Sequence, residues 1–136
     1  MNKGLECIVL EGDFGLYCDK IMDFYKLEYG DGFTEATMNN SAFIGLVLKD
    51  DIVVAAGRVI SDLSRHAQLV DLIVGESYRR NGIGSGLVKQ LLGKLKEHKV
   101  IYVGVVKDSD FPWLKDFYIR SGFKPLPADS YFEIIN

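Results

Sequence analysis

One stretch of the sequence, residues 68–106, constrains the fold more than any other. A β-rich run at residues 68–74 comes first, and from Gly82 the apolar residues recur about every four positions, as on one face of a helix. That face consists of Ile83, Leu87, Leu91 and Leu95. A nearly continuous apolar run at residues 100–106 follows and predicts a strand covered on both faces. A strand, a long helix and a second strand form a crossover unit, so the sheet should contain a parallel pair.

The rest of the chain predicts antiparallel strands and shorter helices around this unit. β-rich runs at residues 42–48 and 52–60, joined by a short polar turn, predict a hairpin that continues into the strand at 68–74. Other strands are predicted at residues 5–10 and 131–135. Helices are predicted at residues 16–29, after Thr34 as N-cap, and at residues 111–121, with Gly30 and Gly122 ending the first and last. The fold class is therefore α/β with a mixed sheet.

Composition and charge narrow the functional classes. The 136 residues are 48% hydrophobic, without linker or repeat, and predict a single domain spanning residues 1–136. A net charge of −3 gives no support for a nucleic-acid partner. The absence of an apolar stretch of about 18 residues, and of a basic leader, predicts a cytoplasmic protein without membrane contact. Cys7 and Cys18 lack the spacing of a metal site, so no metal is expected.

The segment between the strand at 68–74 and the long helix carries the chemistry. Backbone N–H groups at the start of that helix are unpaired donors at the positive end of the helix dipole. Gly82 and Gly84 let an anion approach the backbone, while Arg79 and Arg80 add positive charge. The segment therefore suits a diphosphate. The alternative is a tight strand-to-helix turn with solvated arginines.

Two other phosphate-binding motifs do not fit the same residues. The dinucleotide fingerprint G-x-G-x-x-G fails, because the third residue after Gly84 is Leu87 and the loop lies past the middle of the chain. The P-loop fails because Gly86 is not followed by Lys and Ser or Thr. A nucleotide-binding α/β protein is thus a weak alternative.

Two motifs match one family of enzymes. Residues 79–84, Arg-Arg-Asn-Gly-Ile-Gly, fit the pattern Arg/Gln-x-x-Gly-x-Gly/Ala, and residues 117–123 look like a late aromatic helix ending in a Gly-Phe turn. With the order of elements, the chain resembles the GCN5-related N-acetyltransferase (GNAT) superfamily, whose members bind acetyl-coenzyme A (acetyl-CoA). The resemblance implies antiparallel strands around a central parallel pair, with a V-shaped gap where the fourth strand splays from the fifth.

The resemblance also implies where the cofactor binds. Its pantetheine arm would run along the strand at residues 68–74, and the pyrophosphate would lie at the following loop. Backbone contacts are then expected at Leu72, Ile73 and Val74, and pyrophosphate contacts at Arg79, Arg80, Asn81, Gly82, Ile83, Gly84 and Ser85.

Acetyl transfer to an amine needs a proton acceptor, an oxyanion donor and an acid for the leaving thiolate. The resemblance places Tyr118 as that acid, the alternative being an ordinary residue of an amphipathic helix. The early position on the cofactor strand is Gln68, which cannot act as a base. Asp71 is the remaining carboxylate on this strand; it could act as the base, form structural hydrogen bonds or hold the substrate. Strict alternation along the strand puts it on the side of Leu69 and Ile73.

The acceptor is expected to be a small-molecule amine or an exposed amino group. In the family the first helices wall this site, which here means about residues 25–40, with Tyr29, Asp31 and Glu35 able to attract a cation. A non-catalytic acyl-CoA binder or interaction module on the same fold is the alternative, since Gln68 replaces a carboxylate. An apolar last strand at residues 131–135 would leave an unpaired sheet edge that can pair with a second copy of the chain, so a homodimer is slightly favoured.

Overall fold

The structure is a computed structural model that describes residues 4–106 and 112–136. The chain forms two compact units, Met1–Val106 and Lys107–Asn136. Among the described residues, the first unit contains the sheet and three α-helices, and the second contains one α-helix. Within the described residues, no helix is both long enough and apolar enough to cross a membrane.

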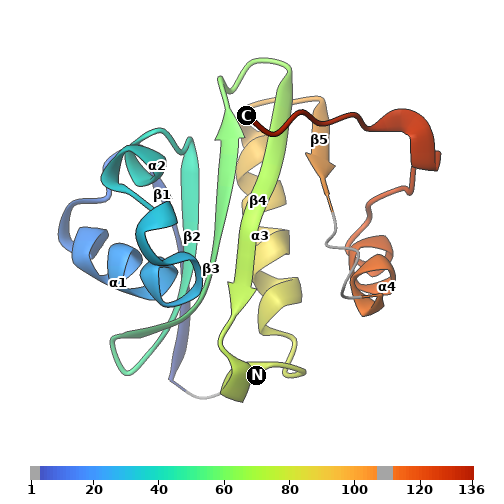
Figure 1. The fold of residues 1–136 in the computed structure, drawn as a ribbon. Helices are drawn as coiled ribbons and strands as arrows, with labels where there is room; N and C mark the ends of the chain where they lie inside the picture. The colour runs from blue at the N-terminus through green and yellow to red at the C-terminus, as the bar shows by residue number, and fades with distance from the viewer. Residues whose placement is uncertain (1–3, 107–111) are drawn as a thin grey trace. The chain divides into compact units, whose positions relative to one another are not determined.

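The first unit is built on one five-stranded sheet whose strands lie in chain order (Figure 1). The strands are β1 (Leu5–Glu11), β2 (Phe43–Lys49), β3 (Ile52–Ser61), β4 (His66–Val74) and β5 (Tyr102–Val105). Pairs β1–β2, β2–β3 and β3–β4 are antiparallel, whereas β4–β5 is parallel. The predicted meander and the predicted parallel pair are both confirmed. The parallel pair forms the edge of the described sheet rather than its centre.

Helices cover the two faces of this sheet (Figure 1). On one face, α1 (Cys18–Tyr29) and α2 (Glu35–Asn39) bury Ile21, Tyr25 and Met38 in one cluster with Ile44 and Leu46 of β2. On the other face lies α3 (Ile83–Glu97), whose buried side chains are the periodic apolar residues of the sequence. Because side chains alternate along β2, residues 44 and 46 meet α1 while Gly45 between them meets α3. We call these the α1 face and the α3 face.

A pair of glycines in β2 and β3 allows α3 to pack close to the sheet. Gly45 of β2 lies directly opposite Gly57 of β3. A Cβ at Gly45 would lie 2.6 Å from Leu87 Cδ1, and one at Gly57 would lie 3.3 Å from Leu91 Cδ1. Both leucines are fully buried. The missing side chains therefore form a shallow depression in which α3 packs close to the strands.

The predicted helix ends around α1 and α2 are confirmed. Gly30 follows α1 with a φ of 56°, a left-handed conformation that glycine adopts without strain. Thr34 caps α2 in a capping box, in which its side chain accepts a hydrogen bond from the Thr37 backbone while Thr37 accepts one from the Thr34 backbone. These ends fix the connection of residues 30–34 between the two helices.

Two apolar runs differ from expectation. Residues 102–105 of the run at 100–106 form β5, in which Tyr102 is exposed and the other three residues are half-buried, so no residue of the strand is fully buried. Residues 131–135 form no strand, which makes the predicted last strand wrong. Both patterns report only β propensity, while burial and pairing depend on a neighbouring element that the pattern does not specify.

The second unit contains α4 (Trp113–Arg120), followed by the 3₁₀ turn Ala128–Ser130. Gly122 ends α4 with a φ of 103°, as predicted. Pro112 directly precedes the helix, and Phe111, where the predicted helix begins, lies outside the described residues.

Candidate active site

The parallel contact between β4 and β5 covers only the first part of β4. Pairing begins at His66 with Tyr102 and ends at Leu69 with Val105. From Val70 onward β4 pairs with β3 alone among the described residues, and it extends beyond the end of β5 in Figure 1. Leu72, Ile73 and Val74, the predicted backbone contacts of the cofactor, lie in this one-sided part. A strand edge of this kind offers main-chain donors and acceptors to an extended ligand.

A β-bulge stands at the start of the one-sided segment. Arg58 pairs with Val70 and Ala56 with Ile73, so Asp71 and Leu72 together face Gly57. Asp71 has a φ of 53°, in the left-handed region that non-glycine residues rarely adopt. A bulge bends its strand and increases the local twist. The direction of β4 therefore changes where the one-sided segment begins.

The bulge also corrects the predicted facing of Asp71. Strict alternation puts Asp71 with Leu69 and Ile73, opposite Val70. In the structure Val70 lies opposite Arg58 in the β3–β4 pair, and Arg58 also forms an ion pair with Asp71. Val70 and Asp71 therefore share the α1 face, while Leu69 lies on the α3 face. Two parts of the expectation are confirmed: Asp71 shares its face with Ile73, which packs against the α1 cluster, and it lies opposite Leu72, which is on the α3 face.

Asp71 belongs to a polar network on the α1 face. Arg58 Nε donates to Asp71 Oδ2 at 2.7 Å, and the same guanidinium donates through Nη1 to Ser41 Oγ at 2.9 Å and to the Thr37 carbonyl at 3.2 Å. Arg58 is only 8% exposed. A buried guanidinium needs such partners, since an unpaired charge in the interior is costly.

Two tyrosines of α1 complete the network. Tyr25 donates its hydroxyl hydrogen to the Asp71 carbonyl at 2.8 Å, and burial raises its pKa well above the usual value. Burial, followed by the charge of Asp71 and a hydrogen bond to it, raises the pKa of Tyr29 to about 12. Both hydroxyls therefore stay protonated at neutral pH, and that of Tyr25 donates to Asp71.

The loop after β4 leads from the strand end to the start of α3. It passes through the 3₁₀ turn Glu76–Tyr78, and Arg79 Nε then donates back to the Val74 carbonyl at 2.9 Å. Arg80 and Gly82 both have positive φ, of 66° and 75°. This hydrogen bond keeps the guanidinium of Arg79 at the C-terminal end of β4.

The N-terminus of α3 is suited to an anion. No side chain caps it, its first turn contains no acidic residue, and a Cβ at the N-cap Gly82 would meet nothing within 4 Å. The N–H groups of Ile83, Gly84 and Ser85 are first-turn donors that the helix itself does not use. A pyrophosphate therefore fits the chemistry of these residues. The predicted contact residues at 79–85 are contiguous in the loop and the first turn of α3, and all of them except the buried Ile83 are at least partly exposed.

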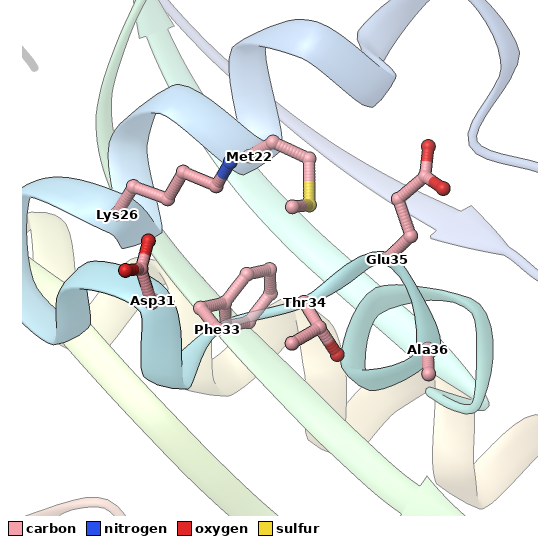
Figure 2. Close-up of a pocket in the computed structure, with 7 residues that line it drawn as sticks. All are labelled: Met22, Lys26, Asp31, Phe33, Thr34, Glu35 and Ala36. Carbon is pink, nitrogen blue, oxygen red and sulfur yellow. The ribbon is translucent and has the colours of Figure 1, made fainter.

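A pocket of about 420 Å³ opens on the α1 face between α1 and the start of α2 (Figure 2). It is lined by Met22, Lys26, Asp31, Phe33, Thr34, Glu35 and Ala36. Figure 2 shows the Phe33 ring in the middle of this group, with Lys26 extended from α1 above it. Of the residues expected to attract an amine, Asp31 and Glu35 line the pocket and Tyr29 does not.

Phe33 connects the pocket to the network around Asp71. Its ring stacks on Tyr25 at a centroid distance of 4.4 Å, and the Arg58 guanidinium carbon lies 5.9 Å from the ring centroid. Phe33 and Tyr25 are both buried. The wall of the pocket and the bulge of β4 are thus linked through side chains in direct contact.

Tyr118 lies on α4 in the second unit. Its half-buried ring packs edge-on against Phe117 and Phe123, at centroid distances of 5.1 and 5.7 Å. Burial raises its pKa, so the phenol is a hydrogen-bond donor at neutral pH.

Arg58 is the residue of this region that sequence reasoning missed. The signal available was a single arginine inside the apolar run at residues 52–60, where a buried charge requires a partner. Within residues 4–106 and 112–136, no group of acidic, histidine and cysteine side chains is arranged to hold a metal ion.

Comparisons with known proteins place this geometry in context. The model of the acetyltransferase (GNAT) family matches residues 14–123. A GNAT-family acetyltransferase from Streptococcus pneumoniae is similar in structure, with 27% identity, a TM-score of 0.79 and 96% of each chain covered. Among curated proteins, none matches this sequence.

Two aminoglycoside acetyltransferases share the fold at lower identity. One comes from an uncultured soil metagenomic sample and was solved with trehalose. It is 17% identical to this chain with a TM-score of 0.72, and the match covers 98% of this chain and 99% of the other. The other, AAC(6')-Iy, was solved with a bisubstrate analogue containing CoA; it is 9% identical with a TM-score of 0.77, covering 97% and 99%.

Proposed function

The chain belongs to the GNAT acetyltransferase family, and we propose that it transfers an acetyl group from acetyl-CoA to a primary amine of a small molecule or to an exposed amino group. One observation carries the proposal. The one-sided end of β4 leads through Arg79 directly to the uncapped N-terminus of α3. An extended arm with a diphosphate at one end is complementary to this sequence of features.

The cofactor is proposed to bind through main-chain groups and the loop. Leu72, Ile73 and Val74 would bind the pantetheine arm as an added strand. The diphosphate would be held by the loop and first-turn residues Arg79, Arg80, Asn81, Gly82, Ile83, Gly84 and Ser85. Arg79 and Arg80 are exposed, so their charges reach solvent without rearrangement of the core.

The acceptor is proposed to enter the pocket beside α1 and α2. The carboxylates of Asp31 and Glu35 favour a cationic amine, while the ring of Phe33 offers an apolar surface to its carbon skeleton. Aminoglycosides, the substrates named for two enzymes of this fold, are amines of this charge class. The acceptor proposed here is defined only by that class.

The chemistry assigns one role to each group. Acetyl-CoA would supply a thioester, whose acetyl group would pass to the amine as the thiolate leaves, and the proton lost by the amine would pass to solvent water. A backbone N–H near Ile73 or Val74 is the proposed donor to the oxyanion, and Tyr118 is the proposed acid that protonates the thiolate. For Asp71 the contact with Arg58 favours a hydrogen-bonding role over that of a general base, because Oδ2 already accepts a charge-assisted bond.

We propose a homodimer as the assembled form. Phe132, Ile134 and Ile135 are each more than 80% exposed in the second unit, which is unusual for apolar residues of a monomer. A second copy of the chain is the partner that would cover this segment. Light scattering should give a mass near twice 15.2 kDa, and deletion of residues 131–136 should return it to that of one chain.

A calorimetric titration tests the cofactor assignment. The wild-type chain should bind acetyl-CoA and CoA with unit stoichiometry, and bind ATP and NAD more weakly. Arg79→Glu should raise the Kd for acetyl-CoA on the order of 10-fold or more, as expected for the loss of a charge-assisted contact. Lys96→Glu reverses an exposed charge at the far end of α3 and should leave the Kd unchanged. Preference for ATP or NAD would instead support a nucleotide-binding protein.

A screen of amines distinguishes the enzyme from a non-catalytic acyl-CoA binder. The engagement of Asp71 by Arg58, together with Gln68 in place of a carboxylate, is the observation that favours the second candidate. The enzyme should release CoA in the presence of at least one cationic amine. Saturable binding without acetylated product from a broad panel would establish the binder.

A further inference from the structure

The β-bulge of β4 is held from both faces of the sheet. On the α1 face, Arg58 binds the Asp71 carboxylate at 2.7 Å and Tyr25 binds the Asp71 carbonyl at 2.8 Å. On the α3 face, Leu72 lies over Gly57, whose added Cβ would be 3.1 Å from Leu72 Cδ1. The extra residue is thus fixed in position rather than free to shift along β3.

Asp71 needs this support because its backbone conformation is unfavourable. A φ of 53° in a residue other than glycine persists only where the surroundings enforce it. Arg58 is the one buried cation among the described residues, and its partners come from three different elements: Asp71 on β4, the Thr37 carbonyl on α2, and Ser41 in the turn before β2. Removal of Arg58 would leave the Asp71 carboxylate without its cation.

The bulge lies immediately before the segment proposed to bind the cofactor. Leu72 belongs to both, and Ile73 and Val74 follow without a partner on the β5 side within the described residues. A change in φ at Asp71 would therefore turn the main-chain groups of residues 72–74 away from their present direction.

We infer that Arg58 is a positioning residue for the cofactor strand. It keeps the bulge at Asp71 in place, and thereby the direction of residues 72–74, without itself touching the cofactor. The inference rests on the proposed function for its cofactor half. Arg58 also contacts the proposed acceptor pocket, since it packs on Phe33 and its Nη1 donates to the Thr37 carbonyl.

The experiment compares Arg58→Met with two controls. Lys20→Met removes the exposed Lys20–Asp51 ion pair of 3.2 Å, which is remote from β4. Leu95→Ala destabilises the core near the C-terminal end of α3. Each variant is assayed for acetyl-CoA Kd and KM, for kcat, and for the backbone NMR shifts of residues 70–74, at a temperature where it is folded.

Arg58→Met should alter the shifts of residues 70–74 and raise the Kd and KM for acetyl-CoA at least 10-fold, with kcat at saturation changed by less than 3-fold. Both controls should retain wild-type shifts and Kd, which separates positioning from a general loss of stability. If Arg58→Met does not fold, Arg58→Met/Asp71→Asn removes the uncompensated carboxylate and should show the same loss of affinity.

The conservative variant provides the rescue. Asp71→Asn keeps an acceptor oxygen for Arg58, and asparagine tolerates positive φ, so the backbone shifts of residues 72–74 should be unchanged and the Kd for acetyl-CoA should stay within 3-fold of wild type. The unfolding free energy should fall, because the buried guanidinium loses its anion. Wild-type shifts in Arg58→Met, or altered shifts with unchanged Kd, would overturn the inference. A wild-type chain that bound no acetyl-CoA would refute the proposed function, and with it the claim that Arg58 positions residues 72–74 for the cofactor. The NMR shifts of Arg58→Met would still decide whether Arg58 keeps the bulge at Asp71 in place.

Discussion

Gly45→Ala tests how α3 is seated on the sheet. The added Cβ would lie 2.6 Å from Leu87 Cδ1 and 3.1 Å from Leu91 Cδ2, so one or both leucines must retreat by roughly 1 Å to restore ordinary contact. Both side chains are fully buried, so neither can move out into solvent without displacing its neighbours. Overpacking of this kind costs about 1–3 kcal/mol, offset by about 0.4–1 kcal/mol because alanine restricts the unfolded chain more than glycine does.

The expected net loss is about 1–2 kcal/mol of unfolding free energy, measured by urea denaturation. Gly93→Ala is the matched control, because Gly93 lies inside α3 with nothing within 4 Å of its added Cβ. That change should stabilise the protein by about 1 kcal/mol through helix propensity. Gly45→Ala should also weaken acetyl-CoA binding, since it displaces the helix whose N-terminus is proposed to hold the diphosphate.

A double-mutant cycle identifies the clash. Leu87→Ala alone should cost about 3 kcal/mol through the cavity it creates. Combined with Gly45→Ala, the new methyl group occupies part of that cavity, so the double variant should be about 1 kcal/mol more stable than the sum of the two changes predicts. A Gly45→Ala protein as stable as the wild type, or strict additivity with Leu87→Ala, would refute the close seating of α3.

Three further changes test separate parts of the protein. Tyr118→Phe should lower kcat about 100-fold while the Kd for acetyl-CoA stays within 2-fold, as for a lost general acid; unchanged turnover would remove Tyr118 from the mechanism. Tyr29 has its pKa raised to about 12, so between pH 10 and 12 the unfolded chain loses this proton first and the unfolding free energy falls as pH rises. Tyr29→Phe should reduce that fall in urea titrations at pH 9 and 11, and an equal fall for both proteins would contradict the raised pKa of Tyr29, whose first cause is burial. Thr34→Ala should cost about 1 kcal/mol through the lost cap of α2, whereas a variant with wild-type urea stability would show that the capping box contributes nothing.

Periodicity predicted most of the elements because each depends on local pattern. The four-residue repeat from Ile83 to Leu95 became α3, and the alternating runs at residues 42–74 became three strands in the predicted order. Thr34 and Gly30 marked helix ends through backbone chemistry that acts within one turn. Such signals do not require knowledge of the tertiary partner.

The features that sequence reasoning missed depend on contacts between distant residues. Nothing in residues 66–74 distinguishes a regular strand from one with a bulge at Asp71, because the bulge is enforced by Arg58 and Tyr25, 13 and 46 positions away. The apolar residues 131–135 have the composition of a strand, yet a strand needs a partner to pair with. The features of the loop at residues 79–85 are contiguous in the chain, so an anion site could be predicted there from the sequence; that role stays a prediction.

The sequential order of the strands has a consequence for synthesis on the ribosome. Residues 4–74 contain four strands that each pair with the next, and short turns join β2, β3 and β4, so these three can associate as soon as they emerge. The α3 face of this meander, with its bare glycines at positions 45 and 57, has no cover until residues 83–97 follow. We expect this face to be the part of the nascent chain that a chaperone protects and that aggregates when translation pauses before α3.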